Sequence, residues 1–472
     1  SNLSLNLAVT VRAPDGSDAR FARIKVPSVL PRFVPLEDGR RYVPIEQVIA
    51  ANLHEMFPGM VIDNHHLFRV IRNADLALEE EEADDLLAAI EIELRRRRFG
   101  SAVCLHVDAE MPQELTAFLQ RELELDETDV YRITGPLDLG GLFAITELDR
   151  PELKDEPWPP VTQQLLMRSD DEPTIFFNVL RDHTILVHHP YDSFASSVEE
   201  FIKQAANDPR VLAIKQTLYR TSGDSSIISS LVTAAEQGKE VVALVEVKAR
   251  FDEQANIAWA RALEEAGVHV VYGLIGLKTH SKTALVVRRE GNQIRRYWHI
   301  GTGNYNPKTA RLYEDIGVMS SDSEFGGDLN DLFNSLTGFS RHTEYRKLIV
   351  APYAVRDRLL ELIAAQTALG ADGRILMKMN GLVDKVVIEA LYEASAAAVK
   401  VDLLVRSICC LRPGVPGLSE NIRVRSILGR YLEHSRLWRF GQGAEARYFI
   451  GSADVMPRNL DRRIEVVAPV ED

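Results

Sequence analysis

The sequence contains very little cysteine and no long apolar run. Its three cysteines, Cys104 and the neighbouring Cys409 and Cys410, provide neither a disulfide framework nor the spacing of zinc ligands. A stretch of about 18 or more apolar residues is missing, which argues against a transmembrane helix. The opening residues, "SNLSLNLAVTV", lack the basic and apolar regions of a signal peptide. These absences predict a protein of a reducing cytoplasm.

Basic residues are also scarce relative to acidic ones. The 472-residue chain has 55 lysines and arginines against 69 aspartates and glutamates, which gives a formal net charge of −14. Proteins that hold nucleic acid backbones need a widely spread basic surface, so we expect no nucleic acid partner. Any polyanion must instead meet a local basic pocket.

Hydrophobic periodicity divides the chain into three predicted domains. Residues 1–166 mix strand-like and helical patterns, which predicts a mixed α+β domain with the Pro-rich segment "RPELKDEPWPPV" near its end. Residues 167–347 alternate buried strands with amphipathic helices, which predicts an α/β domain with a largely parallel sheet. Residues 348–472 repeat that order in weaker form, so we predict a second α/β domain.

Two short motifs recur in the second and third predicted domains. His280-Ser281-Lys282 runs into one strand-like stretch, and His434-Ser435-Arg436 runs into another. Related strings follow both, "RYWHIGTGNYN" in the first case and "RYFIGSADVMPRN" in the second. Matches at several places in the same order indicate an internal duplication. We therefore predict two similar α/β domains packed face to face.

The chemistry of these motifs favours phosphoryl transfer. Alternation along a strand places His280 and Lys282 on one face, and likewise His434 and Arg436. An imidazole can act as nucleophile or acid and base, and the neighbouring cation stabilises anionic oxygens. The glycines of "GTGN" let backbone N–H groups approach an anion. His188 and His189 have no cysteine or carboxylate at zinc spacing, so we interpret that pair as structural.

The paired motifs resemble the phospholipase D superfamily, in which one histidine attacks phosphorus and the other protonates the leaving group. That superfamily's motif continues HxKxxxxD, whereas this chain has Val287 and Gly441 at the aspartate positions. Longer strings are more similar to the bacterial polyphosphate kinases of the first family. They span nearly the whole chain and include "SNLSLNLAV", "HHPYDSF", "VEVKARFDEQANI", "GLKTHSKTALV", "HIGTGNYNPKTARLYEDIG", "PGVPGLSENIRVRSI" and "RNLDRRIEV".

The resemblance implies reversible transfer of the ATP γ-phosphate to inorganic polyphosphate through a phosphohistidine, with Mg²⁺. His280 matches the phosphorylated histidine, and His434 matches the second catalytic histidine, which is also an ATP ligand. Tyr313 matches an aromatic residue that contacts the nucleotide base, and Arg406 matches a nucleotide-phosphate ligand.

Five further cations are carried over from the resemblance. Two arginines match residues of the Mg-phosphate site, Arg220 and Arg250. Arginine has no free lone pair and cannot ligate a cation, so we interpret both as phosphate clamps beside the metal. Lys282, Arg436 and Arg463 are assigned as further groups that neutralise phosphate.

The resemblance also implies ATP or ADP and polyphosphate as partners, and a homodimer or homotetramer with residues 1–166 as the dimerisation domain. It implies a cytoplasmic location and leaves peripheral attachment to the inner membrane open. The family's N-terminal helical domain does not precede Ser1, and we expect the last domain to be truncated. Because "LIAAQTALGADGRI" is short for the family, we also expect residues to be missing near 365–372.

Two other functions are compatible with duplicated motifs of this kind. One is a phospholipase D-like phosphodiesterase or nuclease, which the absent aspartate disfavours in both copies. The other is a catalytically silent anion-binding scaffold, which the retention of both histidines and their cations disfavours.

Overall fold

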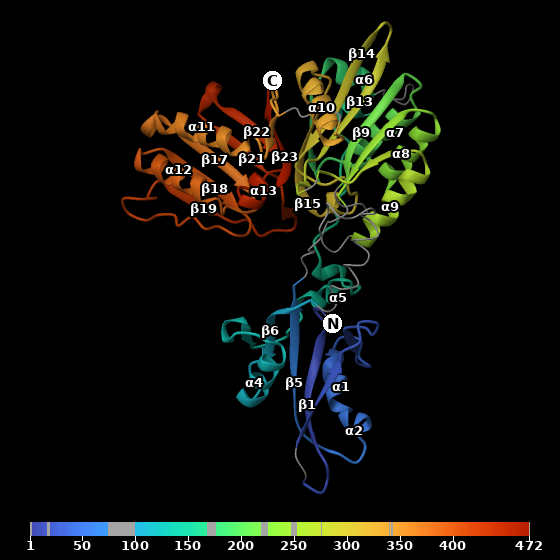
Figure 1. The fold of residues 1–472 in the computed structure, drawn as a ribbon, viewed down its shortest axis with the longest axis vertical. Helices are drawn as coiled ribbons and strands as arrows, with labels where there is room; N and C mark the ends of the chain where they lie inside the picture. Colours follow the sequence, from blue (N-terminus) through green and yellow to red (C-terminus); the bar gives the residue numbers. More distant parts are fainter. Residues whose placement is uncertain are drawn as a thin grey trace. The chain divides into compact units, whose positions relative to one another are not determined.

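A computed structural model describes most of the chain, namely residues 2–16, 19–73, 100–167, 176–218, 225–246, 253–274, 276–338, 340 and 343–471. The chain forms two compact units, Ser1–Glu156 and Pro157–Asp472 (Figure 1). The boundary between them lies in the Pro-rich segment noted above. Within the described residues, no helix is long and apolar enough to span a bilayer.

The first unit is built on one five-stranded sheet. Its order is β2 (Arg20–Lys25), β1 (Leu5–Arg12), β5 (Val61–Arg72), β6 (Ala102–Asp108) and β7 (Val130–Ile133). All neighbours are antiparallel except β6 and β7. The short strands β3 (Phe33–Pro35) and β4 (Tyr42–Pro44) form a separate hairpin.

Helices cover both faces of this sheet because side chains of β1 alternate between two cores. Leu7 and Val9 pack with Leu53, whereas Ala8 packs with Phe68 and Leu119. The helices are α1 (Ile45–Ala51), α2 (Leu53–Met56), α4 (Gln113–Glu122) and α5 (Phe143–Thr146). The predicted mixed α+β character of this part is confirmed.

The second unit contains two sheets with the same strand plan. The first has the order β11 (His269–Val271), β10 (Glu240–Val245), β9 (Val211–Leu218), β13 (Thr283–Glu290), β14 (Gln293–Gly301), β15 (Tyr313–Ser320), with β8 (Ile185–His189) beside β15. The second has the order β19 (Ile422–Arg425), β18 (Lys400–Val405), β17 (Arg374–Met379), β21 (Leu437–Phe440), β22 (Arg447–Gly451), β23 (Arg463–Val470), with β16 (Ile349–Ala351) beside β23. The predicted duplication is therefore confirmed.

The prediction of largely parallel sheets is wrong for half of each sheet. In both, three strands pair in parallel, and the strands that follow the histidine motifs pair antiparallel. The reason is connectivity, since β13 and β14 are joined by a tight turn at Gly291, whose φ of +62° suits glycine. Strands joined by such hairpins must run in opposite directions.

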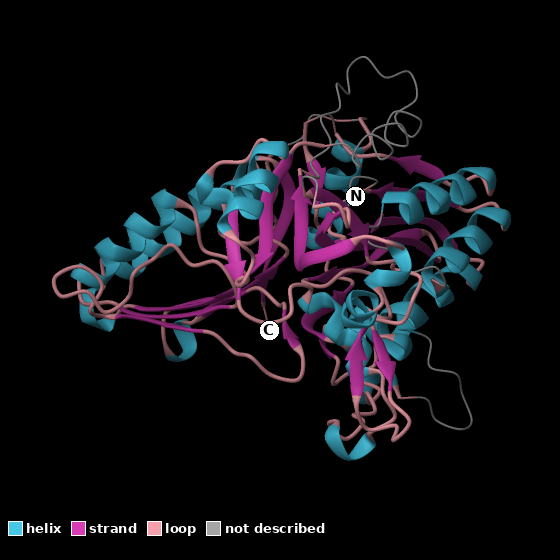
Figure 2. Ribbon diagram, turned by 90° about the horizontal axis from the view of Figure 1, so that it is seen from below, coloured by secondary structure: helices cyan, strands magenta, loops and turns pink. Residues whose placement is uncertain are grey.

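Helices pack against both sheets (Figure 2). Those of the first domain are α6 (Phe176–Asp182), α7 (Glu200–Asn207), α8 (Ser226–Glu236), α9 (Glu253–Glu265) and α10 (Ser323–Leu336). Those of the second are α11 (Val355–Thr367), α12 (Lys385–Ala396) and α13 (Pro457–Asp461). Near residues 365–372, a 3₁₀ turn at Gly370–Asp372 joins α11 to β17, and the Arg374 amide donates to Gln366 Oε1 at 3.1 Å.

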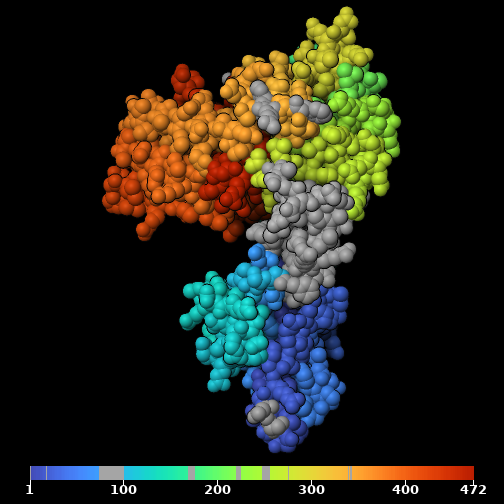
Figure 3. Space-filling model, viewed as in Figure 1, coloured from blue at the N-terminus to red at the C-terminus, as the bar shows by residue number. Residues whose placement is uncertain are grey.

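The two domains share one apolar core, so they pack face to face as predicted. Leu329 and Phe333 of α10 cluster with Ile450 and Val466 of the second sheet. The space-filling view shows the two domains meeting without a gap (Figure 3). Burial of this shared surface holds the domains together.

The domains also exchange short strands. β12 (Lys278–Thr279), which belongs to the first domain in sequence, pairs in parallel with β23 of the second. Conversely, β20 (Leu432–Glu433) pairs in parallel with β15 of the first. Each exchanged strand immediately precedes a motif histidine. The exchange therefore places each histidine against the opposite domain.

The connection between the domains is anchored by a buried carboxylate. Asp328 on α10 is fully buried and accepts hydrogen bonds from the amides of Arg346, Lys347 and Leu348 at 3.1, 2.7 and 3.0 Å. It also accepts from Arg346 Nη1 at 2.9 Å. Charge-assisted bonds of this kind are stronger than neutral ones.

We predict that Asp328→Ala lowers the free energy of unfolding of the second unit by about 2–4 kcal/mol, because three amides, one of them that of the buried Leu348, lose their acceptor. Urea unfolding followed by tryptophan fluorescence measures the change. The matched control is Asp331→Ala, which removes a partly exposed partner of the same Arg346. A change of less than about 1 kcal/mol, typical of exposed pairs, is expected there. Equal effects of both substitutions would contradict the assignment.

A paired-histidine candidate active site

The first motif histidine is held by the second domain. Strand pairing sets Thr279 opposite Ile464, and the next residue on each side is His280 and Glu465. His280 Nδ1 lies 2.9 Å from Glu465 Oε2, and both residues are buried. A neutral imidazole with its proton on Nδ1 donates to this carboxylate and keeps the lone pair on Nε2.

The second motif histidine is held by the first domain in the same way. Strand pairing sets Glu433 opposite Glu314, and the next residues are His434 and Asp315. His434 Nδ1 lies 2.9 Å from both carboxylate oxygens of Asp315. The two halves therefore exchange carboxylates across the domain interface.

The repeated "IG-[TS]" string explains how these carboxylates are oriented. Thr302 Oγ1 donates to Asp315 Oδ1 at 2.6 Å, and Ser452 Oγ donates to Glu465 Oε2. In both copies the hydroxyl residue precedes its carboxylate by 13 positions. A Cβ on Gly303 would lie 2.4 Å from Asp315 Oδ2, so glycine is required there for the carboxylate to approach.

The cation of each motif folds back onto its own histidine. Lys282 Nζ donates to the carbonyl of His280, and Arg436 Nη1 donates to the carbonyl of His434 at 2.8 Å. Arg436 also pairs with Asp454 at 3.0 Å. Both cations are buried, so the site holds dense positive charge away from bulk water.

Burial and neighbouring charge set the protonation of the two halves differently. Burial and the nearby cations lower the pKa of His280 well below its usual value. Burial also lowers the pKa of His434, but Asp315 opposes that effect. Burial raises the pKa of Glu465, whereas bonds to His434 and Thr302 outweigh burial and lower the pKa of Asp315. His434 therefore has the firmer anionic partner, and Asp315 offsets part of the lowering of its pKa.

The other predicted site residues divide into those near the histidines and those outside the described residues. The Tyr313 ring lies 5.2 Å from the His434 ring, centroid to centroid. Arg406 Nη1 donates to the carbonyl of Glu433 at 3.2 Å, and Arg463 starts the strand that carries Glu465. Arg220 and Arg250 lie outside the described residues.

His188 and His189 each have a structural partner. His188 Nε2 lies 2.7 Å from Glu314 Oε1, and His189 Nδ1 lies 2.9 Å from the carbonyl of Asp192. These contacts agree with the interpretation of both as structural.

Sequence reasoning missed the two carboxylates that hold the histidines. It looked for an acid five positions after the motif cation, where Val287 and Gly441 stand. Glu465 and Asp315 instead arrive from the opposite domain. The shared spacing of 13 residues after Ser452 and Thr302 was a signal present in the sequence.

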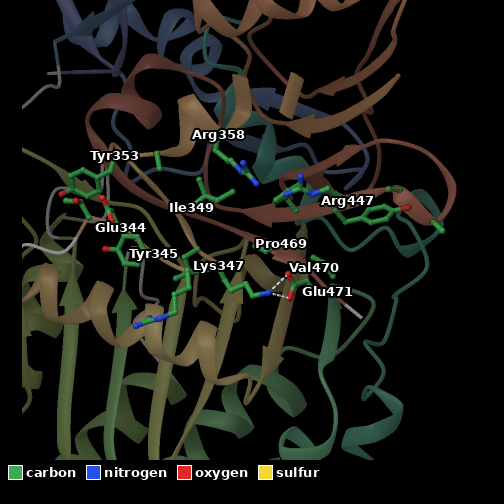
Figure 4. A pocket seen from close by; sticks show the side chains of 18 of the residues that line it. Glu344, Tyr345, Lys347, Ile349, Tyr353, Arg358, Arg447, Pro469, Val470 and Glu471 are labelled. Carbon is green, nitrogen blue, oxygen red and sulfur yellow. Dashed lines mark hydrogen bonds and ion pairs between the residues drawn. The ribbon is translucent and has the colours of Figure 1, made fainter. Parts of the chain in front are cut away.

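A hollow of about 1250 Å³ lies at the ends of β22 and β23 that point away from the histidine site (Figure 4). Its lining includes Lys347, Arg358, Arg447 and Glu471. Lys347 and Arg358 are paired with Glu471 and Glu361, so much of the positive charge is already neutralised. The histidine site, at the other ends of these strands, has the chemistry for phosphoryl transfer.

Among the described residues, no group of three or more His, Cys, Asp or Glu side chains could hold a metal ion. Asp315 and Glu465 are already engaged with the histidines.

Comparisons with known proteins agree on one family. The polyphosphate kinase middle domain matches residues 1–145, C-terminal domain 1 matches residues 175–342 and C-terminal domain 2 matches residues 348–472. The chain is 59% identical to a polyphosphate kinase of Mycolicibacterium gilvum and 57% identical to one of Streptomyces coelicolor. Both alignments cover the whole chain, which spans 66% and 64% of the length of these relatives.

A solved structure supports the same relationship. The crystal structure of polyphosphate kinase from Porphyromonas gingivalis matches with a TM-score of 0.82 and 32% identity. That match covers all of this chain and 70% of the other. The chain belongs to the polyphosphate kinase family.

Proposed function

We propose that this protein reversibly transfers the γ-phosphate of ATP to inorganic polyphosphate through a phosphohistidine on His280. The observation that carries the proposal is the pair of motif histidines, His280 buried and His434 largely buried, each oriented by a carboxylate and accompanied by a buried cation. Membership of the polyphosphate kinase family supports ATP and polyphosphate as the substrates.

In the first step, the lone pair of His280 Nε2 attacks the γ-phosphorus. A P–N bond forms, the bond from phosphorus to the bridging oxygen breaks, and its electrons leave with ADP. Glu465 supports this step by holding Nδ1–H, since the imidazole gains positive charge as Nε2 bonds to phosphorus. The low pKa of His280 keeps the attacking imidazole neutral.

His434 assists the leaving oxygen. Its Nδ1 is held by Asp315, which stabilises the imidazole when it is protonated. In the second step, a terminal oxygen of polyphosphate attacks the phosphoryl group and the P–N bond breaks. The electrons of the P–N bond return to Nε2 of His280, so His280 is again a neutral imidazole with a free lone pair.

The cations supply the electrostatic part of the reaction. Lys282, Arg436 and Arg463 neutralise the transferred phosphate, and Arg406 binds the nucleotide phosphates. Preorganised cations in a buried site stabilise developing anionic charge strongly. Tyr313 contacts the nucleotide base beside His434. Arg220 and Arg250 act as phosphate clamps, and Mg²⁺ arrives as part of the metal–nucleotide substrate.

The proposal extends to assembly and location. Residues 1–166 contribute the contact of a homodimer or homotetramer in the cytoplasm. Large apolar side chains exposed on the first unit, among them Leu139, Phe143 and Leu153, support a contact there. Mass measurement by light scattering tests the assembly.

The two histidines should behave differently on substitution. Incubation with γ-labelled ATP should leave an acid-labile, base-stable phosphate on the protein. His280→Ala should abolish both the label and polyphosphate synthesis, whereas His434→Ala should slow turnover by about two to four powers of ten and still permit slow labelling. Peptide mapping locates the label. Label on His434, or undiminished label in His280→Ala, would overturn the roles, and phosphodiester hydrolysis without label would favour the phosphodiesterase alternative.

Tyr313 should act mainly on nucleotide binding. If its ring stacks on the base, Tyr313→Ala raises the apparent KM for ATP while Tyr313→Phe, which keeps the ring, has a mild effect. Steady-state kinetics at fixed polyphosphate measures both. An unchanged KM for ATP in both variants would contradict the stacking of Tyr313 on the base.

Lys282 should couple polyphosphate binding to proton uptake. Burial lowers the pKa of Lys282 to about 7, so the unliganded amine is charged below that pH and loses its proton as pH rises through it. A bound anion favours the charged form, so binding at pH 8 should take up a proton and affinity should fall between pH 6 and 8. Calorimetry in two buffers of different ionisation enthalpy measures the uptake. Lys282→Arg, whose charge is permanent, should take up fewer protons, and equal uptake would contradict the assignment.

A further inference from the structure

The two half-sites have the same main-chain contacts but different side chains behind them. The carbonyl of Ile464 accepts from the amides of His280 and the following serine at 2.9 and 3.0 Å. The carbonyl of Glu314 accepts from the amides of His434 and its following serine at 3.2 and 2.9 Å. Equivalent positions thus hold an apolar residue in one half and a carboxylate in the other.

The Glu314 side chain forms a network that has no counterpart at Ile464. Its Oε2 accepts from Ser435 Oγ at 2.6 Å and pairs with Lys378 Nζ. Lys378 Nζ also lies 2.7 Å from Glu433 Oε2 and donates to Ser435 Oγ at 2.6 Å. Only 14% of the Lys378 side chain is exposed.

Lys378 occupies a strand position that is neutral in the other half. It pairs with Leu437, the residue after Arg436, in the β17–β21 ladder. In the first domain the corresponding position on β9 is Thr217, which donates to the carbonyl of Ser281 at 2.8 Å. Both residues therefore contact the motif serine, but only Lys378 brings a charge.

The charge matters because His434 lies among charges of both signs. Asp315 bonds to its imidazole, Arg436 Nη1 lies 3.3 and 3.2 Å from its two ring nitrogens, and Glu314 and Glu433 pair with each other one position before Asp315 and His434 in the β15–β20 ladder. Burial raises the pKa of Glu314, but bonds from His188, Lys378 and Ser435 outweigh it and bring the value to about 2. Glu314 is therefore ionised, and a partly buried anion of this kind needs a paired cation.

We propose that Lys378 is a positioning residue for His434. It neutralises Glu314 and Glu433 and holds Ser435 in place, so that His434 keeps the orientation and proton affinity needed to assist the leaving oxygen. The kinetic consequence rests on the function proposed above. The electrostatic consequence belongs to the resting protein and can be measured without turnover.

The test is Lys378→Met, followed in two ways. Removal of the cation leaves two anions near His434, so the pKa of His434 should rise by about half to one unit. ¹⁵N-histidine NMR titration measures it, with the resonance assigned from His434→Gln. Turnover should fall about tenfold or more, and the alkaline limb of its pH profile, where His434 loses its proton, should move to higher pH. Lys378→Arg, which retains the charge, should remain close to the unsubstituted protein.

A second substitution separates positioning from simple loss of stability. Lys378→Met combined with Glu314→Gln removes the cation together with one anion, so the pKa of His434 and part of the turnover should return. Lys385→Met is the matched control, because Lys385 is an 86% exposed lysine on α12 paired with Glu389. It should change neither quantity.

Two results would overturn the proposal. One is an unchanged His434 pKa with unchanged turnover in Lys378→Met. The other is a loss of turnover in Lys378→Met that is accompanied by a lower Tm and that is not reversed when Glu314→Gln is added. If Lys378→Met does not fold, the double variant and Lys378→Arg are titrated instead. The proposal then fails if the pKa of His434 in either of them differs clearly from that of the unsubstituted protein. Absence of polyphosphate synthesis by the unsubstituted protein would reject the proposed function instead, while the titration still tests Lys378.

Discussion

The hydrogen bonds between each motif histidine and a carboxylate of the opposite domain are the constraint on which the site depends. His280 bonds to Glu465, and His434 bonds to Asp315. Neither domain can orient its own histidine, so the strand exchange of β12 and β20 and the shared apolar core are conditions for the site to exist. Removing charged groups from water is costly, and good hydrogen-bond geometry must offset that cost. Thr302 and Ser452 provide it by bonding the same carboxylates.

The duplication makes the halves alike in backbone and unlike in charge. In one half, the His280 amide bonds to the carbonyl of Ile464, and the carboxylate partner is Glu465, whose pKa is raised by burial. In the other half, the His434 amide bonds to the carbonyl of Glu314, and the carboxylate partner is Asp315, whose pKa is lowered. A neutral nucleophile suits the first environment, and a proton donor suits the second. The different roles of the two histidines therefore follow from the residues of the opposite domain that contact them, and not from the histidine motifs themselves.

The sequence was sufficient for elements whose signals are local. Periodicity predicted the α/β alternation, and the repeated histidine and "IG-[TS]" strings predicted two similar domains. The antiparallel halves of the sheets were missed because a buried strand reads the same in either direction. Glu465, Asp315 and Lys378 were missed for a different reason. The 13-residue spacing after Thr302 and Ser452 marks Asp315 and Glu465, but which histidine each one orients, and the role of Lys378, depend on which strands of the two domains lie together.

The missing aspartates of the HxKxxxxD pattern can now be explained by the space available at those positions. Gly441 has a φ of +91°, and a Cβ there would lie 3.0 Å from the carbonyl of Glu445, so a larger side chain is strained. Val287 lies in the middle of β13 and is partly buried against the shared core, so a carboxylate there would place a charge against an apolar cluster. Orientation by the opposite domain makes both aspartates unnecessary for the histidines. It also couples the halves, because any separation of the domains would release both histidines at once.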